Sequence, residues 1–222
     1  MPRDSHEPIT PDEIIRAYSL GYFPMARARD DAEVVWVLPD ERGVIFPADA
    51  KMPKRLARTV RQEIFEIRVN TAFGKVLEAC AEQQKSRPDT WINDAIIEVY
   101  SELHYMGLAH SVECWRGGKL AGGLYGVALG GVFCGESMFS RERDASKVAM
   151  AHLMARIKAG GFKMIDAQFY NEHLVQFGLI GLPNEDYQTR LQAALLESPL
   201  DVFGPDYQSD TTSVLQSITQ TS

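Results

Sequence analysis

The stretch AHSVECWRGGKLAGGLYGVALGGVFCGESMFS, residues 109–140, predicts three consecutive antiparallel strands. Glycine-containing turns at 116–119 and 129–131 separate its three runs of strand-forming residues, as tight turns do in β-hairpins. These glycines do not form a phosphate-binding loop, because they neither open a helix after a strand, as G-x-G-x-x-G does, nor end in Gly-Lys-Ser or Gly-Lys-Thr. We therefore expect a β-meander.

Strand and helix patterns on both sides of the meander predict an α+β fold. Residues 65–69 alternate apolar and charged side chains, which is typical of a half-exposed strand, and 93–106 carry apolar residues at helical spacing. Further helices are expected at 73–83, 147–160 and 186–196, and a strand at 162–168. The order of these elements is that of an N-acetyltransferase (GNAT-type) acyltransferase core, although other α+β folds share it.

The regular series of strands and helices starts after residue 62. We expect a small α+β N-terminal domain at residues 1–62 and a GNAT-like catalytic domain at residues 63–200. The first domain begins with Thr10-Pro11-Asp12-Glu13, a capping box that starts a helix. Towards the end of the chain the sequence is mostly Ser, Thr, Gln and Asp, so we expect residues 201–222 to form a disordered tail.

Size and composition indicate a soluble globular protein. The chain has 222 residues, of which 45% are hydrophobic and 24% charged, and no apolar run reaches the roughly 18 residues of a membrane span. Its first residues mix both charge signs, so we do not expect a secretory signal there. Cys80, Cys114 and Cys134 form no C-x-x-C pair, so we expect reduced thiols in the cytoplasm, without disulfides or a metal site.

One segment is strongly basic in an otherwise acidic chain. The net charge of −7 argues against a protein that coats nucleic acid generally, so a polyanion would need a local basic patch. Residues 51–61 fit a helix with Met52, Leu56 and Val60 on one face. The other face carries Lys51, Lys54, Arg55, Arg58 and Arg61. We interpret it as a phosphate-contacting surface, the alternative being a solvated helix face that happens to be basic.

Two polar side chains end the strand expected at 162–168. With a side-chain period of two, Asp166 and Gln168 lie on the same face as Phe162 and Met164. Burying an unpaired amide costs roughly 2 to 7 kcal/mol, so the strand end must open into a cleft, give each group a partner, or simply reach water.

The chain carries, in one order, the motifs Gly21–Met25, Trp36–Gly43, Thr90–Ile92, His110–Glu113, Gly122–Val127, Phe133–Ser140, Ala145–Lys147 and Ile165–Gln168. Together they resemble the bacterial leucyl/phenylalanyl-tRNA-protein transferase family, over residues 10–196. The resemblance implies an enzyme that moves Leu, Phe or Met from aminoacyl-tRNA to the α-amino group of proteins that begin with Lys or Arg, which marks them for degradation. It also implies that no metal and no cofactor is needed, and we expect a monomer.

The same resemblance assigns the chemistry to a few polar residues. Asp166 and Gln168 match positions proposed as catalytic. Glu136 is the third candidate catalytic residue, and it could instead hold the substrate amine or its cationic side chain, with help from Asn171. Gln168 cannot be a general base, because a neutral amide has no suitable pKa, so Asp166 is the candidate proton acceptor or electrostatic orienter. His110 and His173 are alternative bases.

Binding of the amino acid and of the tRNA end is also implied. The apolar pocket for Leu, Phe or Met is expected from Leu124, Phe133, Met138, Met150, Leu153 and Ile165, with Ser137 beside it. Methionines suit this task because they repack around unlike side chains. Trp91 matches a tryptophan that stacks on the terminal adenosine, and Trp36 is expected to contact tRNA, although Val37 stands where the family usually has a second tryptophan.

Two other functions stay open. An acyl-CoA-dependent N-acyltransferase would share the fold, but Ser140–Ser146, before the next helix, contains no glycine and two acidic residues, which disfavours a CoA pyrophosphate site. A non-catalytic RNA-binding adaptor would bind tRNA without transferring an amino acid.

Overall fold

The computed structural model describes residues 9–31, 33–82 and 90–219 and confirms an α+β fold. The strands are β1 (Phe23–Ala26), β2 (Val34–Val37), β3 (Glu41–Ile45), β4 (Glu66–Val69), β5 (Ala109–Arg116), β6 (Lys119–Leu129), β7 (Val132–Ser140), β8 (Met164–Asp166) and β9 (Ile180–Pro183). The α-helices are α1 (Pro11–Ser19), α2 (Lys54–Arg61), α3 (Phe73–Ala81), α4 (Asp94–Tyr105), α5 (Ala145–Gly160), α6 (Glu172–Val175), α7 (Asn184–Leu195) and α8 (Thr211–Thr219), and η1 (Pro47–Asp49) is a 3-10 helix.

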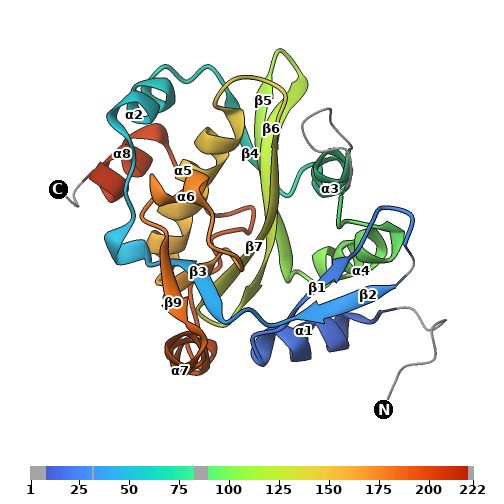
Figure 1. Ribbon diagram of the computed structural model, residues 1–222. Coiled ribbons are helices and arrows are strands. Elements are labelled where there is room, and N and C mark those ends of the chain that lie inside the picture. Colours follow the sequence, from blue (N-terminus) through green and yellow to red (C-terminus); the bar gives the residue numbers. More distant parts are fainter. Residues whose placement is uncertain (1–8, 32, 83–89, 220–222) are drawn as a thin grey trace.

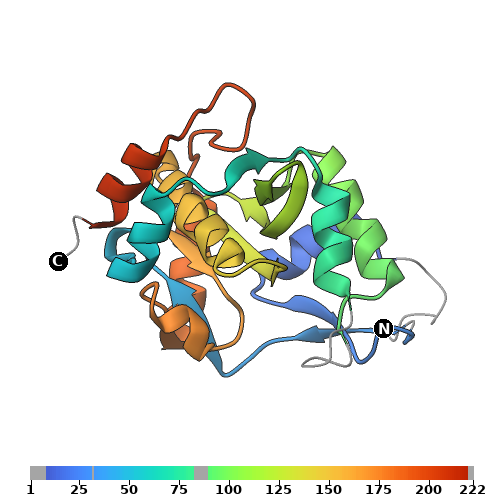
Figure 2. The same cartoon turned by 90° about the horizontal axis from the view of Figure 1, so that it is seen from above.

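A seven-stranded mixed sheet in the order β4-β5-β6-β7-β8-β3-β9 forms the body of the molecule, and β1 and β2 form a separate two-stranded sheet. Helices α1, α3 and α4 lie on one side of the large sheet and α2, α5 and α8 on the other (Figures 1 and 2). Each side has its own apolar core, because residues from these helices join two separate buried clusters. Burial of both sheet faces explains the apolar and glycine-rich sequence of the central strands.

The predicted meander is confirmed. β5 pairs antiparallel with β6, and β6 pairs antiparallel with β7. The capping box at Thr10 and Glu13 is also confirmed, since the Glu13 carboxylate accepts from the Thr10 backbone N–H at 2.9 Å and the Thr10 hydroxyl accepts from the Glu13 backbone N–H. Local periodicity was a sufficient guide for these elements, because the contacts that form them are close in sequence.

Strands β7 and β8 run parallel, and helix α5 connects them. Their register starts with Val132 opposite Met164 and ends with Cys134 opposite Asp166. β7 continues to Ser140, whereas β8 stops at Asp166, so the pairing of the two strands ends at this point. Glu136 of β7 and Gln168, which follows β8, therefore lie just beyond the last paired residues.

The expected disordered tail is wrong for the part that the structure describes. Helix α8 packs on α5, and Val202, Phe203, Val214 and Ile218 are buried in the core on that side. Val214 and Ile218 are four residues apart and share one helix face, so a few apolar residues at the right spacing outweigh a polar composition. Residues 220–222 lie outside the described part of the chain.

The N-terminal part of the chain is not separated from the large sheet at residue 62. β3 lies inside that sheet, between β8 and β9. The basic helix expected at 51–61 begins only at Lys54, because Pro53 with extended backbone stands at its N-cap. In the described part of the chain, no helix is both long and apolar enough to cross a membrane.

Candidate active site

A cavity of about 410 Å³ lies beside the point where β7 and β8 separate. Apolar side chains from β6, β7, α5, β8 and the segment after α6 line it, namely Leu124, Met138, Met150, Leu153, Ile165 and Phe177. Polar groups reach the same cavity, among them Glu136, Ser137, Lys147, Gln168, Asn171 and His173. The cavity therefore suits a small ligand that is apolar at one end and polar at the other.

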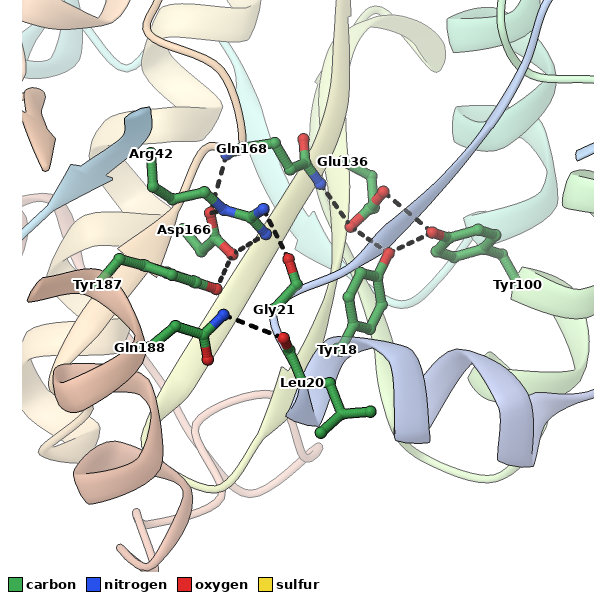
Figure 3. A network of polar contacts seen from close by, with 10 residues as sticks. All are labelled: Tyr18, Leu20, Gly21, Arg42, Tyr100, Glu136, Asp166, Gln168, Tyr187 and Gln188. Atoms are coloured by element: carbon green, nitrogen blue, oxygen red, sulfur yellow. Dashed lines mark hydrogen bonds and ion pairs between the residues drawn. The ribbon is translucent and has the colours of Figure 1, made fainter. Parts of the chain in front are cut away.

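Glu136 is a nearly buried carboxyl group with three hydrogen-bond donors (Figure 3). The Tyr18 hydroxyl donates to Oε1 at 2.7 Å and the Tyr100 hydroxyl donates to Oε2 at 3.0 Å. The Gln168 amide donates to Oε1 at 3.0 Å. Burial raises the pKa of Glu136 to about 7, even though the bonds from both tyrosines lower it. The carboxyl group can therefore change its protonation state near neutral pH.

Asp166 is fully buried and forms a bidentate ion pair with Arg42 (Figure 3). Arg42 donates from Nε to Oδ1 at 2.8 Å and from Nη2 to Oδ2 at 2.7 Å. Tyr187 donates its hydroxyl to Oδ2 at 2.7 Å. Burial by itself lowers the pKa of Arg42, but the Asp166 carboxylate reverses this and raises it. Arg42 thus stays charged inside the protein.

The Arg42 guanidinium is also held from its other sides. It lies over the Phe23 ring at 4.8 Å and the Tyr187 ring at 4.6 Å from the ring centres. Its Nη1 donates to the Gly21 carbonyl oxygen at 2.9 Å. Cation–π contacts of this desolvated kind contribute about 2 kcal/mol. The ion pair therefore ties the α1–β1 connection and α7 to the end of β8.

The expectation that Asp166 and Gln168 share one strand face is wrong. β8 ends at Asp166, and Gln168 has a left-handed backbone with φ of 60°. The Asp166 side chain turns inward to Arg42, whereas Gln168 turns towards Glu136 and lines the cavity. A left-handed backbone costs a non-glycine residue about 1–3 kcal/mol, and it persists here because Asp166 Oδ1 accepts from the Gln168 backbone N–H at 2.9 Å.

The expected pocket residues divide into two groups. Leu124, Ser137, Met138, Met150, Leu153, Ile165 and Asn171 line the cavity. Phe133 does not, because it is fully buried in the core beneath, with its ring 5.5 Å from that of Phe203. Phe133 contacts Phe203, which belongs to the segment 201–222 that the sequence predicts to be disordered. The core environment of Phe133 is therefore not predictable from the sequence.

The two alternative histidine bases occupy different places. His173 is exposed and lines the cavity. His110 lies outside it, with its ring stacked on Phe203 at 4.2 Å, and burial lowers its pKa to about 4. His110 is therefore a neutral core residue at neutral pH.

The tryptophans expected to contact tRNA lie around the β1–β2 hairpin. Trp36 is exposed on β2, opposite Pro24 of β1. Trp91 is half-buried against the core formed by α1, α3 and α4, and its carbonyl oxygen accepts from the Ala26 backbone N–H at 3.1 Å. Neither tryptophan lines the cavity.

The basic residues expected to contact phosphate are all on the surface. Lys51 precedes α2, and Lys54, Arg55, Arg58 and Arg61 lie on its exposed face, while Leu56 and Val60 are buried. Lys51 is fixed beside the cavity, since its backbone N–H donates to the carbonyl oxygen of the cavity residue Phe177.

A second group of charges joins α2 to the start of α5. The Asp144 carboxylate lies 3.9 Å from Arg55, 3.7 Å from Arg143 and 3.8 Å from Lys147. Lys147 lines the cavity. The basic surface of α2 therefore continues past Asp144 to Lys147 at the cavity.

Sequence reasoning missed Tyr18, Tyr100, Arg42 and Tyr187, which hold the two carboxyl groups. The sequence holds a signal for the arginine and for one of the tyrosines. Arg42 directly precedes the run Gly43-Val44-Ile45, so a buried position, which requires a charged partner, was one reading of it. Tyr18 shares the apolar face of its helix with Ile14, and a buried tyrosine hydroxyl needs a polar partner.

Comparisons with known proteins give a consistent result. A family model described as leucyl/phenylalanyl-tRNA protein transferase matches residues 44–192, and one described as the N-terminal domain of that transferase matches residues 7–40. Proteins named leucyl/phenylalanyl-tRNA–protein transferase are similar to this chain over most of their length. The protein of Paramagnetospirillum magneticum is 53% identical over 191 residues, which cover 86% of this chain and 91% of the relative. The protein of Caulobacter vibrioides is 50% identical over 213 residues, which cover 96% of this chain and 98% of the relative.

Proposed function

Since the chain belongs to the leucyl/phenylalanyl-tRNA protein transferase family, we propose that it moves an amino acid from aminoacyl-tRNA to the N-terminal amino group of a protein. The donors are tRNAs charged with Leu, Phe or Met, and the acceptors begin with Lys or Arg and are thereby marked for degradation. The enzyme acts as a cytoplasmic monomer without a metal or cofactor. The observation that carries this proposal is an apolar cavity that also contains the hydrogen-bonded pair Glu136 and Gln168.

The cavity selects the amino acid. A volume of about 410 Å³ is near the lower end of the roughly 300–1,000 Å³ of ligand sites, so it takes one side chain and the adjoining ester. Met138 and Met150 in its wall adapt to the branched side chain of Leu, the ring of Phe or the thioether of Met. Selection against other apolar residues is then modest, about 1–3 kcal/mol per methylene.

The reaction is aminolysis of an ester that is already activated, so the enzyme needs mainly to position the two reactants. An α-amino group has a pKa of about 7.7–8, and a useful fraction is therefore the neutral nucleophile near pH 7. Gln168 holds the ester carbonyl or the incoming amine by hydrogen bonds. Asn171, which also lines the cavity, assists in holding the amine.

Asp166 acts through Gln168. Its carboxylate is fully buried, bound to Arg42, and hydrogen-bonded to the Gln168 backbone. We therefore assign Asp166 to positioning rather than to proton transfer. Replacement of Asp166 should lower transfer by displacing Gln168 and leave binding of Phe-tRNA largely intact.

The acceptor stem lies along α2 and the start of α5. Lys51, Lys54, Arg55, Arg58 and Arg61 contact phosphates, and the cations around Asp144 continue this path to the cavity. Trp91 and Trp36, near the β1–β2 hairpin, contact the terminal adenosine. Affinity for tRNA then falls steeply as salt rises, because each neutralised phosphate releases counterions.

We also propose that the large sheet and its helices form a GNAT-like acyltransferase core. The parallel pair of β7 and β8, joined by α5 and separating beside the cavity, supports a GNAT-like core. The segment between β7 and α5 holds the acids Glu142 and Asp144 in place of a glycine loop, which supports an enzyme that needs no CoA.

The direct test is transfer of radiolabelled Leu or Phe from charged tRNA to a peptide that begins with Arg. Labelled peptide with the wild-type protein, and its loss with Gln168→Ala despite retained Phe-tRNA binding, is the expected result. Acetyl-CoA turnover without RNA would instead support an N-acyltransferase. Binding of charged tRNA without any transfer by the wild-type protein would support an RNA-binding adaptor.

A further inference from the structure

The carboxyl group of Glu136, which lines the cavity, forms a closed ring of hydrogen bonds with the hydroxyl groups of Tyr18 and Tyr100. Tyr18 of α1 contacts Glu136 Oε1, and Tyr100 of α4 contacts Glu136 Oε2. The two tyrosine hydroxyls also hydrogen-bond to each other. Each of the three side chains therefore touches the other two, as Figure 3 shows.

The number of protons in this ring depends on the charge of Glu136. When Glu136 is ionised, the two hydroxyls supply two protons for three oxygen–oxygen contacts, so one contact has no proton. When Glu136 is protonated, three protons serve three contacts. Glu136 Oε2–H then donates to Tyr100, Tyr100 to Tyr18, and Tyr18 to Glu136 Oε1. One added proton thus completes the ring.

The surroundings of Glu136 allow both charge states. Burial favours the neutral form, while the hydrogen bonds from both tyrosines favour the charged form. Across the site, Asp166 of β8 raises the pKa of Glu136 and Arg42 of β3 lowers it. The other titratable groups nearby are Cys134 of β7, Tyr125 of β6, Lys147 of α5 and His173 of α6. With a Glu136 pKa of about 7, the ring can gain and lose its third proton near neutral pH.

We propose that Glu136 is the proton carrier of the transfer reaction and that Tyr18 and Tyr100 are the residues that position it. This inference rests on the proposed function. The amine nitrogen forms a bond to the ester carbon and gives one proton to the ionised Glu136 carboxylate, which completes the ring. The bond from that carbon to the ribose oxygen then breaks, and the oxygen keeps the electron pair and takes the proton from Glu136. Glu136 ends as it began, and no oxidant or reductant is involved.

The position of Glu136 suits this role better than that of other acids near the cavity. Glu136 lines the cavity and is bound to Gln168, whereas Asp166 is fully buried and already paired with Arg42. A proton carrier must accept and donate in one cycle, and this is most efficient when its pKa lies near the working pH.

A first experiment measures the pKa of Glu136 by NMR, in the absence of tRNA. In the protein labelled with ¹³C at the glutamate carboxyl groups, the signal absent from Glu136→Gln should titrate near pH 7. Titration at the ordinary glutamate value of 4.5 would overturn the proposal.

A second experiment measures transfer of Phe from Phe-tRNA to hydroxylamine, and each rate is divided by the concentration of neutral hydroxylamine at that pH, because hydroxylamine itself gains a proton in mild acid. The wild-type rate should fall in acid with a midpoint that matches the ¹³C titration. In Glu136→Gln this pH dependence should vanish and the rate should fall by roughly 100-fold or more, with Phe-tRNA binding kept. A Glu136→Gln enzyme with the wild-type rate would overturn the proposal.

Tyr105 is a matched control for Tyr100, because both lie on α4. Tyr100→Phe should move the midpoint of the pH profile, whereas Tyr105→Phe should not, because Tyr105 is 89% exposed. An unchanged midpoint in Tyr100→Phe and Tyr18→Phe would remove the tyrosines from the proposal. Failure of the wild-type protein to transfer at all would instead refute the proposed function, whatever the titration shows.

Discussion

Replacement of Arg42 by Met tests the buried ion pair that shapes the end of β8. The change removes two bonds to Asp166, one bond to the Gly21 carbonyl oxygen, and the contacts with two aromatic rings. Asp166 is then left as a buried carboxylate whose remaining donors, among the residues that the structure describes, are the Tyr187 hydroxyl and the Gln168 backbone N–H. Removing one partner of a buried pair costs about 3–5 kcal/mol, which is a large part of the 5–15 kcal/mol by which proteins are typically stable.

The free energy of unfolding, measured in denaturant, should fall by this amount in Arg42→Met. Adding Asp166→Asn should recover about 2 kcal/mol, because it removes the uncompensated charge. Arg68→Met is the matched control, since Arg68 also pairs with an acid and lies over a tryptophan ring, but at the surface. It should change stability little, as exposed ion pairs contribute little.

The result that refutes this reasoning is an Arg42→Met variant as stable as Arg68→Met. Additive effects of Arg42→Met and Asp166→Asn would also refute it, because they would show that the two charges do not depend on each other. Transfer should decline in Arg42→Met as well, since Gln168 loses the fixed Asp166 that holds its backbone.

Three further predictions concern the carboxyl group, the basic helix and the C-terminal segment. Because folding raises the pKa of Glu136 from 4.5 to about 7, its stabilising effect is complete below pH 4.5 and is lost as pH rises through 7. Compared with Glu136→Gln, the wild-type protein should therefore lose about 3 kcal/mol between these limits, measured by denaturant unfolding at each pH. Replacing Lys54 and Arg58 by Ala should weaken Phe-tRNA binding and reduce the slope of log K against log salt by about 1 for each lost phosphate contact. Val214→Asp should release α8, because it buries a charge without a partner, and limited proteolysis should then cleave near residues 205–210.

Each of these has a control and a contrary outcome. A stability difference between wild type and Glu136→Gln that does not vary with pH would show that Glu136 titrates normally. Lys75→Ala, on α3 across the sheet, should leave the salt slope unchanged, and an equal effect there would deny α2 a special role. Thr212→Asp adds the same charge near Val214 but at an exposed position. It should stay resistant to protease, and cleavage of both variants would mean that α8 is not held by its apolar face.

The elements were predictable where their contacts are local. The meander, α3 and α4 follow from periodicity and turn residues alone. The partner of Asp166 was not predictable in this way, because Arg42 is 124 residues away and β3 joins the sheet only in the folded protein. The left-handed Gln168 has no sequence signal, since its conformation depends on a bond to the buried Asp166.

The candidate site was predictable in its residues more than in its geometry. Glu136, Gln168 and most of the apolar lining were expected from the sequence and from its resemblance to the family, and the structure gathers them around one cavity. The role of Asp166 could not be predicted from the sequence, because a carboxylate at the end of an apolar strand can point either to the cavity or into the protein. Only the position of Arg42 decides between the two.

In the proposed reaction the cavity holds the transferred amino acid next to Glu136 and Gln168. The most direct measurement is a crystal structure of the protein with a non-hydrolysable amide analogue of phenylalanyl-adenosine. We predict that the phenyl ring lies between Met138, Met150 and Leu153, with the carbonyl oxygen within hydrogen-bond distance of the Gln168 amide and the carbonyl carbon next to Glu136. A ring bound elsewhere, with this cavity empty, would contradict the account.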